Sequence, residues 1–371
     1  MRAVLPAVFA LAACAQLPQI NDSLTWPPRR VPSLVELEEE VVVETRERGV
    51  DLLVVLDTSA SNFHQIPRLV AAMPSLFGVL AAQRIDWHLG LITTDTERDG
   101  PRGRLVEVDG LKVLDAHTAE VAGAFARLVE AAPAQREDEQ GLQAVTLTLR
   151  NRSVALQEAN VGFRRKGAAL HALVYTDEDD GGAVSPEEVA DLFAELALAA
   201  GAPTSLSAIS GTKNAGCVLR DADGDVVSHI EAGTAYVRAA EQTGGLFRSY
   251  CTWDLGPALA DVGEHASLLR RSYPLSQRPR AGTLEVEVAL ADTVLVGLDA
   301  DATVDTAAPG RACAQPEADR CFPYTYDAQQ NAVVVTGWVP PKGAELTFRY
   351  ELEEGAPSRE EEGSAGREGG E

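Results

Sequence analysis

Residues 50–57 read VDLLVVLD, an apolar run that is interrupted only by Asp51 and ends in Asp57. A strand that is buried on both faces has this pattern, whereas a half-exposed strand alternates apolar and polar residues. Strands buried in this way belong to parallel sheets that are covered by helices on both sides. The run therefore predicts the first buried strand of an α/β domain.

Strand and helix patterns alternate after this run. Ser185-Pro186 marks one helix start, because serine caps helices and proline suits their first turn. The further strands that we predict cover residues 85–94, 168–175, 205–210 and 244–250. The other predicted helices cover residues 63–82, 118–132, 140–149, 235–242 and 257–269. This alternation predicts a doubly wound, mostly parallel sheet over residues 50–270, with a hairpin inserted at residues 217–228.

The chain changes character after residue 270. Residues 271–282 contain proline and arginine and are predicted to be a linker. Short alternating segments at residues 283–352 then predict a small all-β, sandwich-like domain. Residues 353–371 are rich in Glu, Gly and Ser and carry almost no apolar side chains, so we expect a disordered acidic tail.

The N-terminal residues predict export. Arg2 precedes the apolar residues 3–13, a run that is too short to span a bilayer but is typical of a signal peptide. Leu11-Ala12-Ala13-Cys14 resembles a bacterial lipobox, in which the cysteine is lipidated and becomes the new N-terminus. An ordinary signal peptide, with an incidental Cys14, is the alternative.

We accordingly expect a signal peptide at residues 1–13 and a lipidated tether at residues 14–49 that leads from the membrane. Because Ala15 rather than Asp follows the cysteine, we expect the outer membrane of the cell envelope. Within the tether, the sequence of residues 35–45 fits either an edge strand or a short helix.

Four further cysteines form an even set, which in an exported chain predicts two disulfides. Three pairings exist. We expect Cys217 to pair with Cys251 and Cys313 with Cys321, because each bridge then closes within one predicted domain.

Charge and motif content exclude several function classes. The 371 residues include 32 Lys and Arg against 56 Asp and Glu, a formal charge of -24 that argues against nucleic acid as a partner. The six histidines form no HExxH motif, and the chain contains neither a Walker sequence nor GxGxxG. We therefore predict that the protein is not an enzyme.

One motif does predict chemistry. Asp57-Thr58-Ser59-Ala60-Ser61 reads DxSxS and follows the first buried strand, at the carboxyl edge where open α/β sheets bind ligands. Carboxylate and hydroxyl oxygens are hard ligands that suit Mg²⁺, Ca²⁺ or Mn²⁺. We expect Mg²⁺ first, with Ca²⁺ and Mn²⁺ as alternatives.

With this motif on that strand, the chain over residues 50–269 resembles a von Willebrand factor A-type domain. The metal-ion-dependent adhesion site of that family combines DxSxS with a threonine on a second loop and an aspartate on a third. The resemblance implies that Asp57, Ser59 and Ser61 are metal ligands, with Asp177 as the third-loop aspartate. It also implies that the cation keeps one position open for an acidic group of a partner.

The second loop departs from the family pattern. Residues 133–142 contain neither serine nor threonine, which leaves Asp138 or Glu139 as a replacement ligand and a degenerate site as the alternative. An added carboxylate would hold a cation more firmly but weaken its attraction for an acidic partner. The acids at 178–180 are expected to be solvated, with Asp180 supporting its own loop.

The resulting functional hypothesis is a cell-envelope lipoprotein that binds an acidic group of a protein partner through its metal, in adhesion or complex assembly. A structural envelope protein with a degenerate site is the alternative, followed by a metal-dependent hydrolase.

Overall fold

The computed structural model describes residues 36–42, 49–134, 139–150, 152–269, 271–290, 293–299, 321–335, 340 and 343–352. Within these ranges, no helix has the length and apolar character needed to cross a membrane. Cys14, Asp138 and Cys313 lie outside the described residues, as do the expected signal peptide and acidic tail. The Cys313–Cys321 pairing and the lipid anchor therefore remain predictions.

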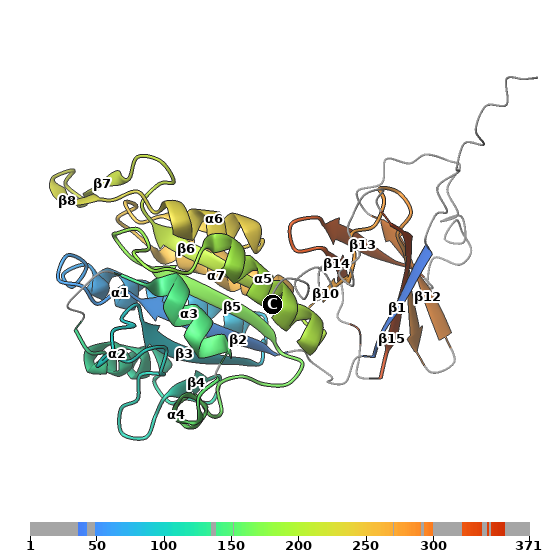
Figure 1. Ribbon diagram of the computed structural model, residues 1–371, viewed down its shortest axis with the longest axis horizontal. Coiled ribbons are helices and arrows are strands. Elements are labelled where there is room, and N and C mark those ends of the chain that lie inside the picture. The colour runs from blue at the N-terminus through green and yellow to red at the C-terminus, as the bar shows by residue number, and fades with distance from the viewer. Residues whose placement is uncertain are drawn as a thin grey trace, which may run out of the picture. The chain divides into compact units, whose positions relative to one another are not determined.

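A six-stranded sheet forms the centre of an α/β domain, with the order β4-β3-β2-β5-β6-β9 (Figure 1). All neighbours pair in parallel except β3 and β4, which are antiparallel. The strands are β2 (Val50–Leu56), β3 (Trp87–Thr93), β4 (Val113–Asp115), β5 (Ala169–Tyr175), β6 (Thr204–Ser210) and β9 (Phe247–Ser249). Every residue of β2, β5 and β6 is buried, as the apolar runs predict.

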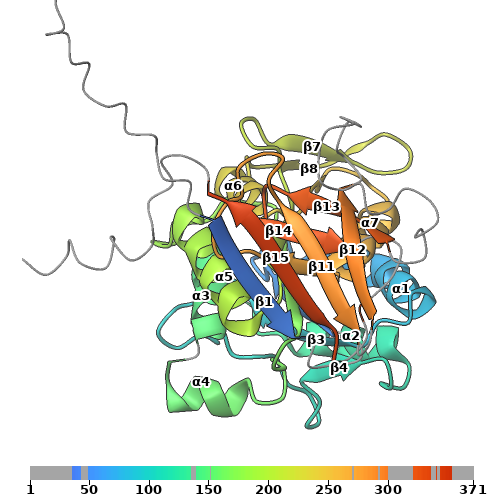
Figure 2. The ribbon, with the colours of Figure 1, turned by 90° about the vertical axis from the view of Figure 1, so that its right-hand side faces the viewer.

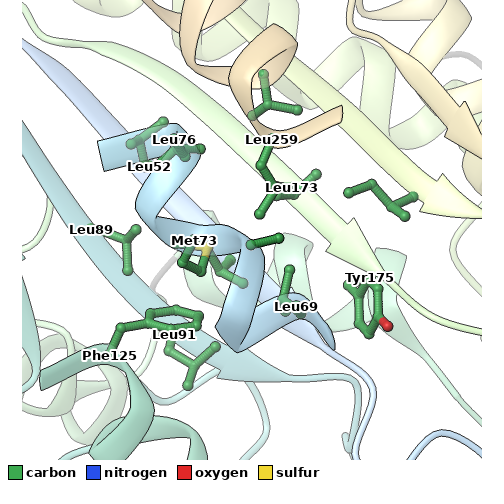
Figure 3. Close-up of a cluster of buried hydrophobic side chains, with 14 of the residues drawn as sticks. Leu52, Leu69, Met73, Leu76, Leu89, Leu91, Phe125, Leu173, Tyr175 and Leu259 are labelled. Carbon is green, nitrogen blue, oxygen red and sulfur yellow. The ribbon is translucent and has the colours of Figure 1, made fainter. Parts of the chain in front are cut away.

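Helices cover both faces of this sheet, so the predicted doubly wound architecture is confirmed. They are α1 (Ile66–Ala82), α2 (Val121–Ala131), α3 (Gly141–Arg150), α5 (Pro186–Ala200), α6 (Thr234–Gln242) and α7 (Gly256–Leu269). Leu52 and Leu173 face one core, together with Leu69 and Met73 of α1 and Leu259 of α7 (Figure 3). The alternate strand residues face a second core, which α3, α5 and α6 complete. A short helix, α4 (Val154–Ala159), lies outside both cores.

The start of α5 forms as the sequence predicts. The Ser185 hydroxyl accepts a hydrogen bond from the Glu188 backbone N–H, while the Glu188 carboxylate accepts one from the Ser185 backbone N–H. This capping box satisfies donors that the first helical turn leaves free.

A hairpin and a disulfide flank the carboxyl edge of the sheet. Strands β7 (Cys217–Arg220) and β8 (Val226–Ile230) pair antiparallel, which confirms the predicted hairpin. The predicted bridge between Cys217 and Cys251 is present and joins the base of the hairpin to the segment after β9.

A separate seven-stranded sheet has the order β1-β15-β11-β12-β13-β14-β10 (Figure 2). Only β12 and β13 pair in parallel. Its core includes Tyr273, Phe322 and Phe348. The strands are β1 (Glu36–Val42), β10 (Ser272–Pro274), β11 (Glu285–Leu290), β12 (Thr293–Asp299), β13 (Cys321–Asp327), β14 (Ala332–Val335) and β15 (Glu345–Glu351).

Two strands of this sheet come from segments that the sequence assigns to connections. Residues 36–42 form the edge strand β1, which settles the open choice between strand and helix. Residues 272–274, inside the expected linker, form β10. The α/β domain is therefore inserted in the chain between two strands of one sheet.

Candidate metal centre

Asp57 is fully buried directly after β2, and both oxygens of its carboxylate are held in place. Oδ1 accepts a hydrogen bond from the Ser59 backbone N–H at 2.7 Å, and Oδ2 accepts one from the Thr176 hydroxyl at 2.9 Å. Since Thr176 follows β5, the neighbour of β2 in the sheet, two adjacent strand ends fix this carboxylate. The sequence motif gave no indication of Thr176 as a partner.

The side chains of the DxSxS motif and of the third loop converge. Ser59 Oγ lies 2.9 Å from Ser61 Oγ. The Ser61 hydroxyl in turn donates to Asp177 Oδ1 at 3.3 Å and to Glu178 Oε1 at 3.2 Å. Ser61 and Asp177 are 116 positions apart in the chain, so it is the parallel sheet that brings these oxygens together.

The carboxyl groups at this edge repel one another. Burial, the charge of Asp57 and a hydrogen bond to Asp57 raise the pKa of Asp177 to about 7. Burial, a hydrogen bond to Glu178 and the charge of Asp57 raise the pKa of Glu139 to about 8. Both shifts favour the neutral acid, as expected where carboxyl groups crowd together without a compensating positive charge.

Glu139 occupies the place on the second loop where the resemblance leads one to expect a threonine. It is buried just before α3, and its backbone carbonyl accepts a hydrogen bond from the Gly181 N–H at 2.6 Å. Of the two candidate metal ligands on this loop, Glu139 interacts with Glu178 and Asp57, whereas Asp138 lies outside the described residues.

Glu178 is a site residue that sequence reasoning missed. It is half-buried and contacts both Ser61 and Glu139, although we expected it to be solvated. Asp180 does support its loop, as predicted, because it accepts hydrogen bonds from the Leu142 N–H and the Tyr236 hydroxyl. The acidic stretch at residues 177–180 was the available signal, but nothing in it distinguishes Glu178 from its neighbours.

Hydrogen bonds and ring stacking hold the motif loop in place. The Asn62 amide donates to the Asp57 carbonyl oxygen at 2.7 Å, and the Tyr250 hydroxyl donates to Asn62 Oδ1. The Tyr175 ring stacks on that of Tyr250, with 4.9 Å between the ring centroids. The loop is therefore fixed to the segment after β9 as well as to β5.

These residues fit a divalent cation. The two hydroxyls and the surrounding carboxylates are hard oxygen donors, and a cation would offset both the burial and the neighbouring negative charge that raise the pKa values of Asp177 and Glu139. Within the described ranges, no three His, Cys, Asp or Glu side chains are arranged as a ligand set for a metal ion. The hydroxyls of Ser59 and Ser61 lie beside the carboxyl group of Asp177 and are further oxygen donors at this edge.

No family model and no curated protein matches the sequence. Several solved structures align with the chain at low identity. Proximal thread matrix protein 1 from the mussel byssus, solved with a zinc-occupied MIDAS motif, shares 15% identity at a TM-score of 0.36, over 62% of this chain and 48% of that protein. This chain thus spans about half the length of the mussel protein.

Two bacterial structures align comparably. The pilus adhesin SpaC from Lactobacillus rhamnosus GG shares 12% identity at a TM-score of 0.38, over 86% of this chain and 41% of the adhesin. BatB from Bacteroides thetaiotaomicron, described as a conserved hypothetical protein, shares 14% identity at a TM-score of 0.34, over 59% of this chain and 99% of that one.

Proposed function

We propose that residues 50–270 form a von Willebrand factor A-type domain in which Asp57, Ser59, Ser61, Asp177 and Glu139 hold a divalent cation, Mg²⁺ before Ca²⁺ or Mn²⁺. The observation that carries this proposal is the convergence of Ser59, Ser61 and Asp177 from two distant loops onto one point. The protein then acts in adhesion or complex assembly by presenting the cation to an acidic group of a protein partner. It does not catalyse a reaction.

Glu139 modifies this function. A carboxylate in place of a neutral threonine makes the ligand set more negative, so the cation is held more firmly and attracts an acidic group less strongly. Binding of a partner then depends on contacts around the cation as well as on the cation itself. We place the domain at the cell envelope, anchored through a lipid on Cys14, because of the lipobox-like N-terminus.

Calorimetric titration of the full chain with Mg²⁺, Ca²⁺ and Mn²⁺ tests the proposal. We expect micromolar to low-millimolar binding that Asp57→Ala abolishes. Asp115→Ala is the matched control, because Asp115 ends the antiparallel strand β4 and caps a turn through the His117 N–H. Absence of binding heat, together with melting that EDTA leaves unchanged, would overturn the proposal and favour a structural protein.

A further inference from the structure

Three segments at the candidate centre are joined to one another: the β7–β8 hairpin, the segment between β9 and α7, and the DxSxS loop. Glu231, at the end of the β7–β8 hairpin, donates its backbone N–H to the Asp177 carbonyl at 3.0 Å. The Cys217–Cys251 disulfide ties the base of the hairpin to the segment between β9 and α7. That segment reaches the DxSxS loop through the hydrogen bond between Tyr250 and Asn62. The hairpin, the β9–α7 segment and the DxSxS loop are therefore fixed to one another, and we call these three segments the frame.

Two aromatic side chains on this frame are exposed. Phe63 follows the DxSxS motif and is 61% exposed, and Trp253 on the β9–α7 segment is 41% exposed. Arg68 holds the second of them: its guanidinium lies 5.3 Å from the centroid of the Trp253 ring and donates to the Thr252 carbonyl at 2.6 Å. Trp253 is thus positioned on the frame although much of its surface stays open to solvent.

The hairpin adds apolar and acidic groups to the same frame. Val218, Val226 and Val227 are exposed along its two strands. Asp223 and Asp225 are exposed at its tip, where their backbone N–H groups donate to Asp221 Oδ1. Elsewhere in the described part of the α/β domain, the exposed large apolar residues are Val154, Val161, Leu198 and Leu268. None of these four is aromatic.

We propose that Phe63, Trp253 and the β7–β8 hairpin form, together with the cation, one docking surface for a partner segment in which a single carboxylate is flanked by apolar and basic side chains. The carboxylate binds the cation, the apolar side chains cover the aromatic pair, and the basic side chains face the acidic hairpin tip. This inference rests on the proposed function. Aromatic anchors beside a small polar centre are the usual source of affinity at protein interfaces.

Charge complementarity selects this partner rather than a purely acidic one. Glu178, Glu231 and Asp254 lie on the loops around the centre, in addition to the hairpin acids. A partner carrying several carboxylates would meet mostly like charge outside the cation, because these acids outnumber Arg68 and Arg220 on the frame, whereas basic flanks meet mostly opposite charge. Because the carboxylates around the cation weaken its attraction for an acidic group, the partner also needs these flanking contacts in order to bind.

A displayed library of random 12-residue peptides, panned on the full protein in Mg²⁺ and eluted with EDTA, tests the inference. We expect EDTA-eluted peptides to be enriched in one Asp or Glu flanked by Phe, Trp or Leu and by Arg or Lys. Phe63→Ser and Trp253→Ser should each weaken binding of a synthetic enriched peptide by about tenfold or more while Mg²⁺ affinity is unchanged. Asp223→Lys with Asp225→Lys should weaken it as well.

Val161→Ser is the matched control, because Val161 is equally exposed on the segment after α4, which is not part of the frame, and it should leave peptide binding unchanged. The inference is overturned, with the cation site intact, if Mg²⁺ binds but no peptide is enriched, if the enriched peptides lack apolar and basic flanks, or if the two aromatic variants bind like the wild type. If the wild type binds no Mg²⁺ in calorimetry, the proposed function falls and the inference falls with it.

Discussion

Asp57 is the residue on which the candidate centre depends, and its neighbours determine what it can bind. A buried carboxylate needs donors for both oxygens, and here Ser59 and Thr176 supply them. The Thr176 hydroxyl also accepts a hydrogen bond from the Glu178 backbone N–H at 3.1 Å. A single hydroxyl therefore positions two of the acids at the site.

Thr176→Val should weaken Mg²⁺ binding by about ten- to a hundredfold, since groups that orient metal ligands typically have effects of this size. Thr176→Ser keeps the hydroxyl and should bind nearly as the wild type does. The control is Thr148→Val, because Thr148 is also buried and its hydroxyl donates to the Gly103 and Ala144 carbonyls away from the site. Equal affinities in Thr176→Val and the wild type, measured by calorimetry, would contradict this role.

Two buried histidines predict how stability depends on pH. His171 and His265 share the Ser205 hydroxyl, at 2.8 and 3.1 Å. Burial lowers the pKa of His171 well below its ordinary value and that of His265 to about 4, where nearby Asp327 partly opposes the shift and Arg248 adds to it. At these two positions the folded protein therefore binds fewer protons than the unfolded chain between about pH 4 and pH 6.5, the ordinary histidine value, whereas the raised pKa values of Asp177 and Glu139 act in the opposite direction.

The stability contributed by these neutral histidines is complete above pH 6.5 and is lost as the pH falls towards 4, by up to about 1.4 kcal/mol per histidine and pH unit. In His265→Gln, the free energy of unfolding measured by urea titration should fall less steeply over this range. His229→Gln, on the exposed hairpin strand β8, should follow the wild type. Equal slopes for His265→Gln and the wild type between pH 6.5 and 4 would refute the prediction.

At the scale of elements, apolar runs predicted most strands of the α/β sheet, whereas β4, α4, β10 and β13 were missed and β1 was left open between strand and helix. Pro323 lies inside β13, and proline usually argues against an interior strand because it lacks an N–H donor; the structure nevertheless places β13 between β12 and β14. Strand β4 has only three residues and α4 six, which is too short for a periodic pattern.

Some residues of the candidate site can be predicted from the sequence and others cannot. Asp57, Ser59 and Ser61 stand in one short motif, and Asp177 ends a recognisable buried strand, so all four can be named from the sequence. Thr176 and Glu178 adjoin Asp177, but their contacts depend on the pairing of β2 with β5, which a single sequence does not reveal. The structure brings the four residues together, and their role as metal ligands stays a proposal.

The Cys217–Cys251 disulfide should stabilise the frame around the site. It closes a segment with a sequence separation of 34, for which chain-entropy reasoning gives about 4 kcal/mol. Cys217→Ala with Cys251→Ala should lower the free energy of unfolding by up to this amount in guanidinium titration. Ser185→Ala is the comparison, because loss of the α5 cap should remove only about 1 kcal/mol. A double variant as stable as the wild type would contradict this role.

At the scale of the whole molecule, the first and the last described strands, β1 and β15, are neighbours in the same sheet. Strand β1 pairs with β15 along its whole length, and Glu39 accepts hydrogen bonds from the Ser276 N–H and hydroxyl. Leu37 and Val41 pack against the core of that sheet. Residues 36–42 are therefore part of a folded domain, although the sequence assigned them to the tether.

A chain that begins at residue 49 should lose about 2–4 kcal/mol of stability in the seven-stranded sheet, since β15 becomes an exposed edge and the contacts of Leu37 and Val41 disappear. A chain that begins at residue 31 keeps β1 and should match the full protein. Thermal unfolding followed by circular dichroism, with light scattering for aggregation, compares the two. Identical melting of both chains would mean that β1 does not contribute to the fold.

The proposed cation would lie between the DxSxS loop and Asp177, and anomalous diffraction from a crystal soaked in Mn²⁺ would locate it. We predict a single peak within about 2–2.5 Å of Ser59 Oγ and Ser61 Oγ, on the side facing Asp177 and Glu139, which is absent in Asp57→Ala. Two peaks about 4 Å apart would contradict a purely adhesive site and favour a hydrolase. No peak at this edge would mean that the protein holds no cation there and that both the adhesive function and the docking surface are wrong.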